Sequence, residues 1–246
     1  MKVLLIGDSC EDRYFYGDVK RLNPEAPVPI LEYKRGVTSK GMVWNVRENL
    51  RSFGVEVYTS THPEEIIKTR YIDEKSNQQI MRYDEEPTIE PLSFDFPTEW
   101  NNLYDALVIS DYDKGFLTTE KIFELTSRFT GPVFIDSKKT NLPADAYIKV
   151  NELEYERMSY CNYENLIITR GGEGAEYKGD LYPAEKVNVF DVVGAGDTFL
   201  AALTYGYLKY GRIDKAIPLA NRAAAVAVSN RGTYVLTKED VNEILC

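Results

Sequence analysis

One run of residues has the composition to hold an anion and to accept a proton beside it. Gly194, Ala195 and Gly196 carry almost no side chain, so their backbone N–H groups can approach a ligand closely. The apolar segment 198–210 predicts a buried helix, whose start attracts phosphate or a developing negative charge. Asp197 lies in this first turn, where a carboxylate is favoured and can take a proton from a hydroxyl. The alternative is a helix start in which Asp197 only complements the dipole.

Two further motifs place polar side chains where phosphates or a metal ion could bind. Asn151 and Glu154 are three residues apart on a predicted helix, so they share a face and could hold the waters around Mg²⁺. The same spacing is that of a helix capping box, and both interpretations stay open. Thr169 and Arg170 precede a glycine-rich turn. Arg170 could pair with a phosphate through two N–H groups, or be the solvated arginine of a hairpin turn.

Short apolar segments alternate with helical ones through most of the chain. The pattern predicts strands at 2–6, 106–109, 133–135, 147–150 and 166–168, with an extended approach at 188–190. It predicts helices at 42–53, 118–129, 151–160, 198–210, 213–230 and 238–245. This alternation is typical of an α/β fold with a mostly parallel sheet and helices on both faces. Five polar residues follow predicted strands, at the rim where such sheets bind ligands: Asp8, Asp111, Asp136, Asn151 and Arg170.

A second, smaller sheet is predicted from segments that interrupt this alternation. Residues 28–33, 65–71 and 77–83 read as strands, and Pro29 confines the first of them to an edge. Together they could form a small sheet over the site. The acidic, proline-containing segment 87–99 reads as a loop.

Composition excludes several classes of function. The 246 residues carry a net charge of −10 without a basic cluster, which argues against a nucleic-acid partner. No apolar run approaches the length of a membrane span. Cys10, Cys161 and Cys246 are odd in number and lack metal-ligand spacing, so we expect reduced thiols in a cytoplasmic protein. His62 is the single histidine, which excludes Ser-His-Asp catalysis, and we expect it on the surface.

The sequence resembles the ribokinase-like (PfkB) family of carbohydrate kinases. The segment 191–197 fits the family's D-x-x-G-A-G-D signature, while 151–154 and 169–174 fit its N-x-x-E and T-x-G-x-x-G stretches. Gly7-Asp8 with Asp12-Arg13-Tyr14 fits its opening. Within the family the chain is most similar to the bacterial D-glycero-D-manno-heptose-7-phosphate kinase domain, in segments 12–17, 23–29, 77–84 and 110–115.

The resemblance implies a set of roles around ATP and Mg²⁺. Asp197 would be the catalytic base, with Gly194, Ala195 and Gly196 as the anion hole. Asn151 and Glu154 would hold the water shell of the metal ion. The nucleotide would lie near Lys138, Asn151, Thr169, Arg170, Gly172, Gly174 and Asn221. A polar surface position is an equal alternative for Asn221. Asp191 would allow a monovalent cation, although Val193 replaces the threonine often found before the signature and removes a hydroxyl.

The acceptor side is implied in the same way. Asp8 and Asp12 suit sugar hydroxyls, and Arg13 could meet a sugar phosphate. The lid arginines Arg70 and Arg82 are further phosphate candidates or exposed charges. Of the family's G-G-A-x-x-N segment, Gly41 and Asn45 are kept. Lys40 replaces the first glycine, so its cation could serve a phosphorylated substrate or its bulk could block the usual sugar position.

The expected molecule is one ribokinase-like domain over residues 1–246, with lid strands at about 12–35 and 65–84. The expected reaction is transfer of the γ-phosphoryl group of ATP to a sugar or sugar phosphate, foremost heptose 7-phosphate at O1. The alternatives are another sugar or nucleoside acceptor, or a non-catalytic binding protein. A βα unit that the family would place after Gly54 is missing. The lid allows a homodimer, and we expect no fused nucleotidyltransferase domain within the chain.

Overall fold

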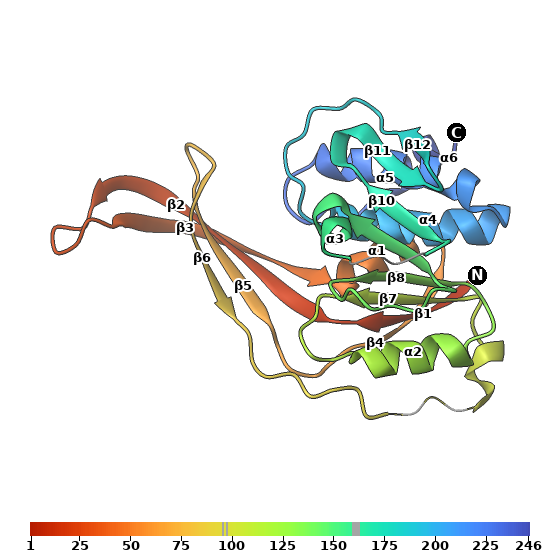
Figure 1. The fold of residues 1–246 in the computed structure, drawn as a ribbon. Helices are drawn as coiled ribbons and strands as arrows, with labels where there is room; N and C mark the ends of the chain where they lie inside the picture. The colour runs from red at the N-terminus through yellow and green to blue at the C-terminus, as the bar shows by residue number, and fades with distance from the viewer. Residues whose placement is uncertain (95, 97, 159–162) are drawn as a thin grey trace.

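Eight strands form the main sheet of the computed structural model, which describes residues 1–94, 96, 98–158 and 163–246 (Figure 1). Cys161, the end of the helix predicted at 151–160 and part of the loop predicted at 87–99 lie outside the described residues. The spatial order is β12-β11-β10-β9-β8-β7-β1-β4. The six parallel strands are β1 (Lys2–Gly7), β4 (Glu56–Ser60), β7 (Ala106–Asp111), β8 (Val133–Ser137), β9 (Tyr147–Asn151) and β10 (Leu166–Thr169). The antiparallel pair β11 (Gly174–Tyr177) and β12 (Asp180–Pro183) closes one side.

Helices cover both faces of this sheet, as the sequence predicted. In β1, Val3 and Leu5 pack among the helices of one face, and Leu4 and Ile6 pack on the other. This double burial explains why the parallel strands read as continuous apolar runs. The first face carries α1 (Val43–Ser52), α4 (Ala195–Tyr210), α5 (Ile213–Val228) and α6 (Lys238–Leu245). The second carries α2 (Thr119–Arg128) and the 3-10 helix η1 (Thr98–Asn102), while α3 (Glu152–Arg157) and η2 (Gly171–Glu173) follow β9 and β10.

The smaller sheet has four strands and extends away from the body as a lid (Figure 1). Its order is β3-β2-β5-β6, so β3, which begins at Pro29, is an edge strand as predicted. Successive side chains along each strand point to opposite faces, so one lid face turns toward the body and the other away from it. The strands are β2 (Ser9–Leu22), β3 (Pro29–Met42), β5 (Ile67–Asp73) and β6 (Gln78–Glu85).

Two helix boundaries lie where local sequence signals predicted them. Thr118 caps α2 by accepting a hydrogen bond from the Lys121 N–H, and Gly54 follows α1 with a positive φ of 79°. None of the described helices has the length and apolar character that crossing a bilayer requires.

Four sequence predictions are corrected by the structure. His62 is buried rather than on the surface: its Nε2 accepts the Ser9 N–H at 3.1 Å and its Nδ1 lies 2.8 Å from the Glu64 carbonyl oxygen. Strand β4 was missed because it is an edge strand with a half-exposed, weakly apolar sequence. The hairpin β11–β12 was read only as a turn. The segment 188–190 joins neither sheet among the described strands, and both Val189 and Phe190 are exposed.

The connection after α1, where the sequence predicted a missing βα unit, is short. After α1 the chain forms β4, which pairs with β1 only and ends the sheet on that side. From β4 the chain passes through residues 61–66 directly into lid strand β5. The shortened connection therefore affects the sheet edge beside β1.

We expect the substitution Leu50→Ala to lower the free energy of unfolding by about 2–5 kcal/mol, because Leu50 is fully buried between α1 and the sheet. Urea unfolding followed by circular dichroism measures this loss. Leu22→Ala is the matched control, because Leu22 is 62% exposed near the lid tip and should change stability by less than about 0.5 kcal/mol. Equal losses in the two variants would show that the packing around α1 has been misjudged.

Candidate active site

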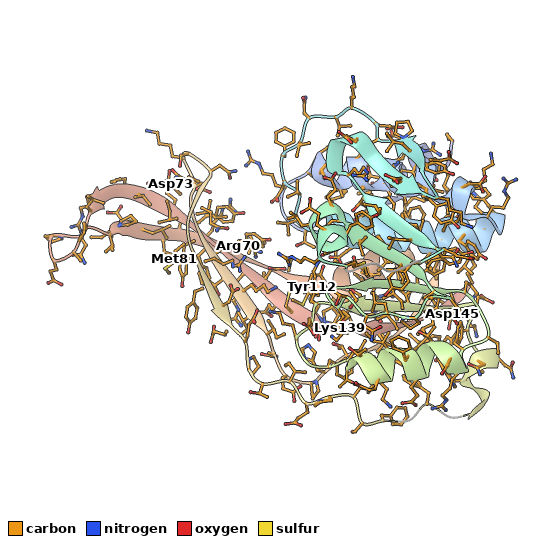
Figure 2. The ribbon with its side chains drawn as sticks, viewed as in Figure 1. Arg70, Asp73, Met81, Tyr112, Lys139 and Asp145 are labelled. Carbon is orange, nitrogen blue, oxygen red and sulfur yellow. The ribbon has the colours of Figure 1, made fainter. Side chains whose placement is uncertain are left out.

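The predicted rim of polar residues is present at the carboxyl ends of the parallel strands. Asp8 follows β1, Asp111 ends β7, Asp136 lies in β8 and Asn151 ends β9. The lid joins the body at this rim. Figure 2 shows Arg70 on the lid and Tyr112 on the body near the junction of the two sheets.

Asp197 lies at the centre of this region, in the first turn of α4. Its side chain is 3% exposed. One carboxylate oxygen, Oδ1, accepts the Tyr112 hydroxyl at 2.7 Å, and Oδ2 accepts the Asn45 amide at 3.2 Å. Asn45, predicted to meet the sugar, therefore contacts the expected base. The Asn45 amide also donates to the Gly194 carbonyl at 3.1 Å, which ties α1 to the start of α4.

The glycine turn before α4 fits tightly against these groups. Gly194 has a φ of 77°, and a Cβ at this position would lie 2.5 Å from the Asn45 amide nitrogen. Any larger residue would push Asn45 away from Asp197. The Ala195 N–H donates to the Val192 carbonyl at 3.3 Å, so this donor of the expected anion hole is engaged within the turn. The following N–H groups, of Gly196 and Asp197, belong to the first helical turn and have no acceptor within the helix.

The environment of Asp197 makes it a weaker acid than usual. Burial raises the pKa of this carboxyl to about 6, and the neighbouring Asp136 carboxylate adds to the rise. Hydrogen bonds from Tyr112 and Asn45 and the charge of Lys149 oppose it. A base with a pKa near the working pH can both accept and release a proton.

A buried ion pair beside the glycine turn was missed by the sequence reasoning. The Lys149 ammonium in β9 lies 2.5 Å from Asp136 Oδ2, and the two residues are only 4% and 7% exposed. Burial alone would lower the pKa of Lys149, but the carboxylates of Asp136, Glu154 and Asp197 together outweigh it and the pKa is raised. A Cβ on Gly196 would lie 2.9 Å from this ammonium. The sequence feature that could have revealed this ion pair is the lysine within the otherwise apolar predicted strand 147–150.

A pocket of about 600 Å³ opens beside Lys149 and Gly196, a size that suits a small-molecule ligand. Of the residues predicted to bind a nucleotide, those in the lining are Asn151, Thr169, Gly172, Gly174 and Asn221, together with Ala195 and Gly196 of the turn. Some of these side chains have structural partners. Asn221 donates to the Tyr182 carbonyl at 2.8 Å, and Thr169 donates to the Val150 carbonyl at 3.1 Å.

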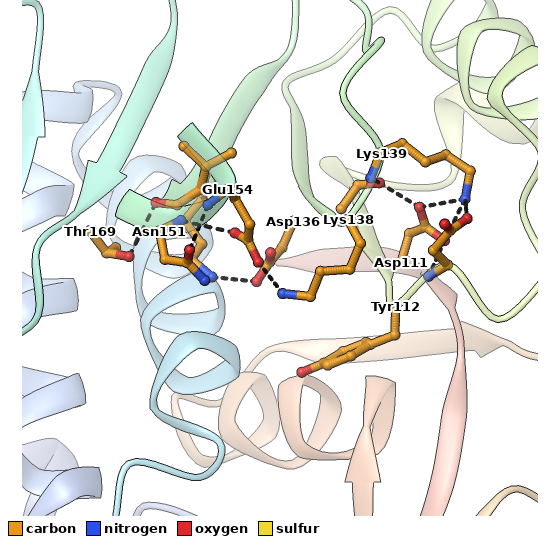
Figure 3. A network of polar contacts seen from close by, with 12 residues as sticks. Asp111, Tyr112, Asp136, Lys138, Lys139, Asn151, Glu154 and Thr169 are labelled. Atoms are coloured by element: carbon orange, nitrogen blue, oxygen red, sulfur yellow. Dashed lines mark hydrogen bonds and ion pairs between the residues drawn. The ribbon is translucent and has the colours of Figure 1, made fainter. Parts of the chain in front are cut away.

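Lys138 and Arg170 are not among the residues that line this pocket. Arg170 is held in ion pairs with Glu176 at 2.7 Å and Glu152 at 2.8 Å, so phosphate binding would require it to leave them. Lys138 forms an ion pair with Glu154, and its ammonium lies 5.5 Å from the Tyr112 ring centroid (Figure 3).

Asn151 and Glu154 form the capping box that was one of the two interpretations. The Asn151 side chain accepts the Glu154 N–H, and the Glu154 side chain accepts the Asn151 N–H, each at 2.9 Å (Figure 3). Although burial opposes ionisation, Lys138 and the Asn151 N–H lower the pKa of Glu154 below its ordinary value. Glu154 is therefore an ionised carboxylate beside the pocket, as a role toward Mg²⁺ would need.

On the acceptor side, Asp12 and Arg70 form an ion pair of 2.5 Å across the lid. Asp12 is 4% exposed, and a Cβ on Gly41 would lie 2.3 Å from its Oδ2, so the glycine leaves room for this carboxylate. Asp8 is fully buried and accepts the backbone N–H of Tyr112 at 2.7 Å. Burial, followed by the charge of Asp111, raises the pKa of Asp8.

The register of the lid strands separates the remaining acceptor candidates. Arg13 pairs with Glu11 at 2.5 Å, and Lys40 lies opposite Glu11 in the ladder, so both lie on the face away from Asp12. This placement supports neither expectation for Lys40, which were that it contacts a phosphorylated substrate or that it blocks the usual sugar position. Arg82 lies opposite Arg70, on the face of Asp12, and pairs with Asp84 at 2.9 Å.

Lys68, which the sequence reasoning did not select, does lie on the face of Asp12. It is opposite Asp12 in the ladder, with its ammonium 6.0 Å from the Tyr112 ring centroid.

Asp191, expected near a monovalent cation, accepts the backbone N–H groups of Val193 and Gly232, each at 3.0 Å. It thereby joins the start of the glycine turn to the loop after α5.

Comparison with known proteins finds one family model and several relatives that match this chain. Residues 137–240 match the model of the pfkB family carbohydrate kinase. The chain is 30% identical to the bifunctional protein HldE of a Nitratiruptor species over 297 aligned residues, covering 98% of this chain and 64% of that protein. It is also 30% identical to HldE of Helicobacter pylori, covering 99% of this chain and 66% of that protein. The chain thus spans about two thirds of the length of these relatives.

Solved structures show the same fold. The ribokinase of Thermotoga maritima superposes with a TM-score of 0.69 at 17% identity, covering 99% of this chain and 98% of that one. Phosphofructokinase-2 of Escherichia coli, in complex with substrates and products, gives a TM-score of 0.72 at 16% identity, covering 98% and 97%. The fold is therefore ribokinase-like, as predicted.

We expect the substitution Asp197→Asn to make the stability of the protein less dependent on pH. The folded-state pKa of about 6 exceeds the ordinary 3.8, so the folded protein holds this proton more tightly and loses stability as pH rises between these values. From pH 4 to pH 8 the free energy of unfolding of the wild type should therefore fall by about 1–3 kcal/mol more than that of the variant. Urea unfolding at both pH values measures it. Asp145→Asn, at an exposed carboxylate, is the control and should show no such shift.

Proposed function

Because the chain belongs to the pfkB family of carbohydrate kinases, we propose that residues 1–246 act as one ATP-dependent sugar kinase domain with lid strands at about 12–35 and 65–84. The observation that carries this proposal is the position of Asp197. Asp197 directly follows Gly196, which lines the pocket, and its buried carboxylate accepts the hydroxyl of Tyr112 near the lid junction. A proton acceptor between a nucleotide and an acceptor hydroxyl is what phosphoryl transfer requires.

In the proposed reaction Asp197 takes the proton of the acceptor hydroxyl. The acceptor oxygen forms a bond to the γ-phosphorus, and the bond to the bridging oxygen of ADP breaks. The N–H groups at the start of α4 and the Lys149 ammonium would face the charged oxygens of the migrating group. Lys149 thereby adds a fixed positive charge to the expected anion hole.

ATP fits the pocket of about 600 Å³ by size and lining. Its phosphates would lie toward Gly196, and its base toward α5 and Asn221. Asn151 and Glu154 would hold the water shell of Mg²⁺, which when bound would neutralise charge on the phosphate oxygens. Thr169, Gly172 and Gly174 would border the nucleotide. Asp191 is retained as the candidate for a monovalent cation.

The lid supports a phosphorylated acceptor, foremost heptose 7-phosphate at O1. Asp12 faces the body with Lys68 beside it, so hydroxyl recognition and a positive charge share one lid face. Arg70 on the same face neutralises Asp12, which leaves the Lys68 charge for a substrate phosphate. The similarity to HldE supports a heptose substrate. The free thiols of Cys10 and Cys246 fit a reducing cytoplasm, where ATP is supplied.

We expect ADP release with heptose 7-phosphate in the wild-type protein and a loss of about 10²- to 10⁴-fold in Asp197→Asn, because the base is removed. Lys68→Met should raise the KM for the sugar phosphate by about 10- to 100-fold and leave that for the unphosphorylated sugar unchanged. A coupled ADP assay measures both effects.

Arg13→Met is the matched control for Lys68→Met, because Arg13 lies on the opposite lid face. Wild-type turnover with no member of a sugar and nucleoside panel would favour the non-catalytic alternative. Turnover of unphosphorylated sugars or nucleosides alone would retain the kinase and reject the phosphorylated acceptor.

The outer lid face supports a homodimer. Phe15 contacts Tyr33 and Tyr71, with ring centroids 5.9 and 5.6 Å apart, and Met81 lies opposite Tyr71 in the ladder. Tyr33 and Met81 are 65% and 52% exposed. We propose that a second copy of this chain covers this apolar face.

Met81→Lys should convert a dimer to a monomer, because it places a charge within the proposed contact. Light scattering after size-exclusion chromatography measures the mass. Leu181→Lys is the control, since Leu181 is 54% exposed but belongs to β12 of the body. A wild-type monomer, or a dimer that survives Met81→Lys, would argue against the lid as the interface.

A further inference from the structure

Tyr112 joins three parts of the site that come from distant parts of the chain. It follows β7, and its backbone N–H donates to Oδ2 of Asp8, after β1, at 2.7 Å. Its hydroxyl donates to Oδ1 of Asp197, in α4, at 2.7 Å. The side chain thus bridges the rim of the sheet and the expected base. Figure 3 shows the hydroxyl end of Tyr112 pointing away from the ion pair that Lys139 forms with Asp111 at 2.9 Å.

The two hydrogen bonds on Asp197 determine the orientation of its carboxylate. Asn45 from α1 holds one oxygen and Tyr112 holds the other, so rotation of the carboxylate would break at least one bond. Both donors are themselves anchored. Asn45 contacts Asn49 at 2.9 Å, and the backbone of Tyr112 is fixed by Asp8. A catalytic group gains most when its orientation is fixed before the reaction.

The surroundings of the Tyr112 ring keep its hydroxyl a donor. Burial, reinforced by the Asp197 carboxylate, raises the pKa of Tyr112 well above its ordinary value, so the phenol keeps its proton. The ammonium groups of Lys138 and Lys68 lie 5.5 and 6.0 Å from the ring centroid. Tyr112 is therefore close both to a lysine that follows β8 and to a lysine of lid strand β5.

We propose that Tyr112 is a positioning residue for phosphoryl transfer, whose hydroxyl fixes the carboxylate of Asp197 toward the acceptor hydroxyl. The proposal rests on the proposed function of Asp197 as the base. Tyr112 neither gains nor loses a proton in the reaction. The proton of the acceptor goes to Asp197, and the phenol remains a hydrogen-bond donor throughout.

The test is Tyr112→Phe, which removes the hydroxyl and keeps the ring. We expect kcat to fall about 10- to 100-fold, as for loss of a hydrogen bond to a charged group, with the KM for ATP unchanged. The acidic limb of the kcat/KM profile should move to higher pH, because the Tyr112 hydrogen bond lowers the pKa of Asp197. The other titratable groups facing Asp197 are Asp136 from β8, Lys149 from β9 and Cys10 from β2, and the variant leaves all three in place.

Tyr147→Phe is the matched control. It removes a hydroxyl that contacts Tyr207 at 3.3 Å, at the opposite end of β9 from Asn151, and should alter neither kcat nor the pH profile. An unchanged kcat in Tyr112→Phe would overturn the proposal. A lower KM for the acceptor with higher kcat would also overturn it, since Tyr112 would then be a plug that substrate displaces. A fall in kcat without a shift of the acidic limb would show only a structural effect.

A second measurement separates this proposal from the proposed function. Carboxyl NMR titration of Asp197 in the wild type and in Tyr112→Phe follows the hydrogen bond without any turnover. We expect the Asp197 titration to move to higher pH in the variant, from about 6 in the wild type. Identical titrations would overturn the role of Tyr112 whatever the activity. If the wild-type protein shows no turnover, the proposed kinase function is overturned. The titration would still decide whether Tyr112 holds the carboxylate of Asp197.

Discussion

The site depends on keeping a carboxylate ionised where water is excluded. Asp197 is almost fully buried, and burial raises the pKa of its carboxyl, which works against the ionised form that the proposed base needs. Three groups from different elements oppose that effect: the Asn45 amide, the Tyr112 hydroxyl and the Lys149 ammonium. Asn45 comes from α1, Lys149 from β9, and Tyr112 directly follows β7. The chemistry at the start of α4 therefore requires that α1, β7 and β9 be assembled around it, and the fold supplies that assembly.

Three ion pairs lie around this centre. Asp136 holds Lys149, Glu154 holds Lys138 and Asp12 holds Arg70. Breaking a buried pair is costly, so a phosphate that reaches this region must replace one partner by an equally charged one. Phosphate oxygens can take over the cations, while sugar hydroxyls can donate to Asp12 with Arg70 still paired to it. The pairing thus favours substrates that bring both negative charge and hydroxyl groups, as a sugar phosphate does.

Local patterns made much of the fold predictable. Continuous apolar runs located the central parallel strands, Thr118 and Gly54 marked helix ends, and the glycine turn placed Asp197 at a helix start. The motifs also predicted that Asn151, Thr169 and Gly172 would gather at one site, since strand ends of a parallel sheet meet at one rim. Strand β4 was beyond this reasoning because an edge strand lacks the double burial that produces an apolar run.

Side-chain partners were harder to predict because they depend on tertiary contacts. Asn45 was expected at the sugar, and only the packing of α1 against α4 shows that it contacts Asp197. His62 looked like a surface residue, because a polar side chain gives no sign in the sequence that a backbone N–H will meet it in the interior. Arg13 and Asp12 are adjacent in the sequence, yet strand alternation places them on opposite lid faces.

Two departures from the family pattern, Lys40 and the short connection after Gly54, lie away from the centre of the site. Lys40 shares the outer lid face with Glu11 and lies 5.0 Å from the Trp44 ring centroid, so it does not enter the space in front of Asp12. The alignment of 297 residues is longer than this chain of 246, which agrees with a missing unit relative to HldE. That shortening is visible at β4, on the side of the sheet opposite β10 and the pocket. Because Asn45 comes from α1, Tyr112 follows β7 and Lys149 comes from β9, the short connection after β4 leaves the surroundings of Asp197 intact.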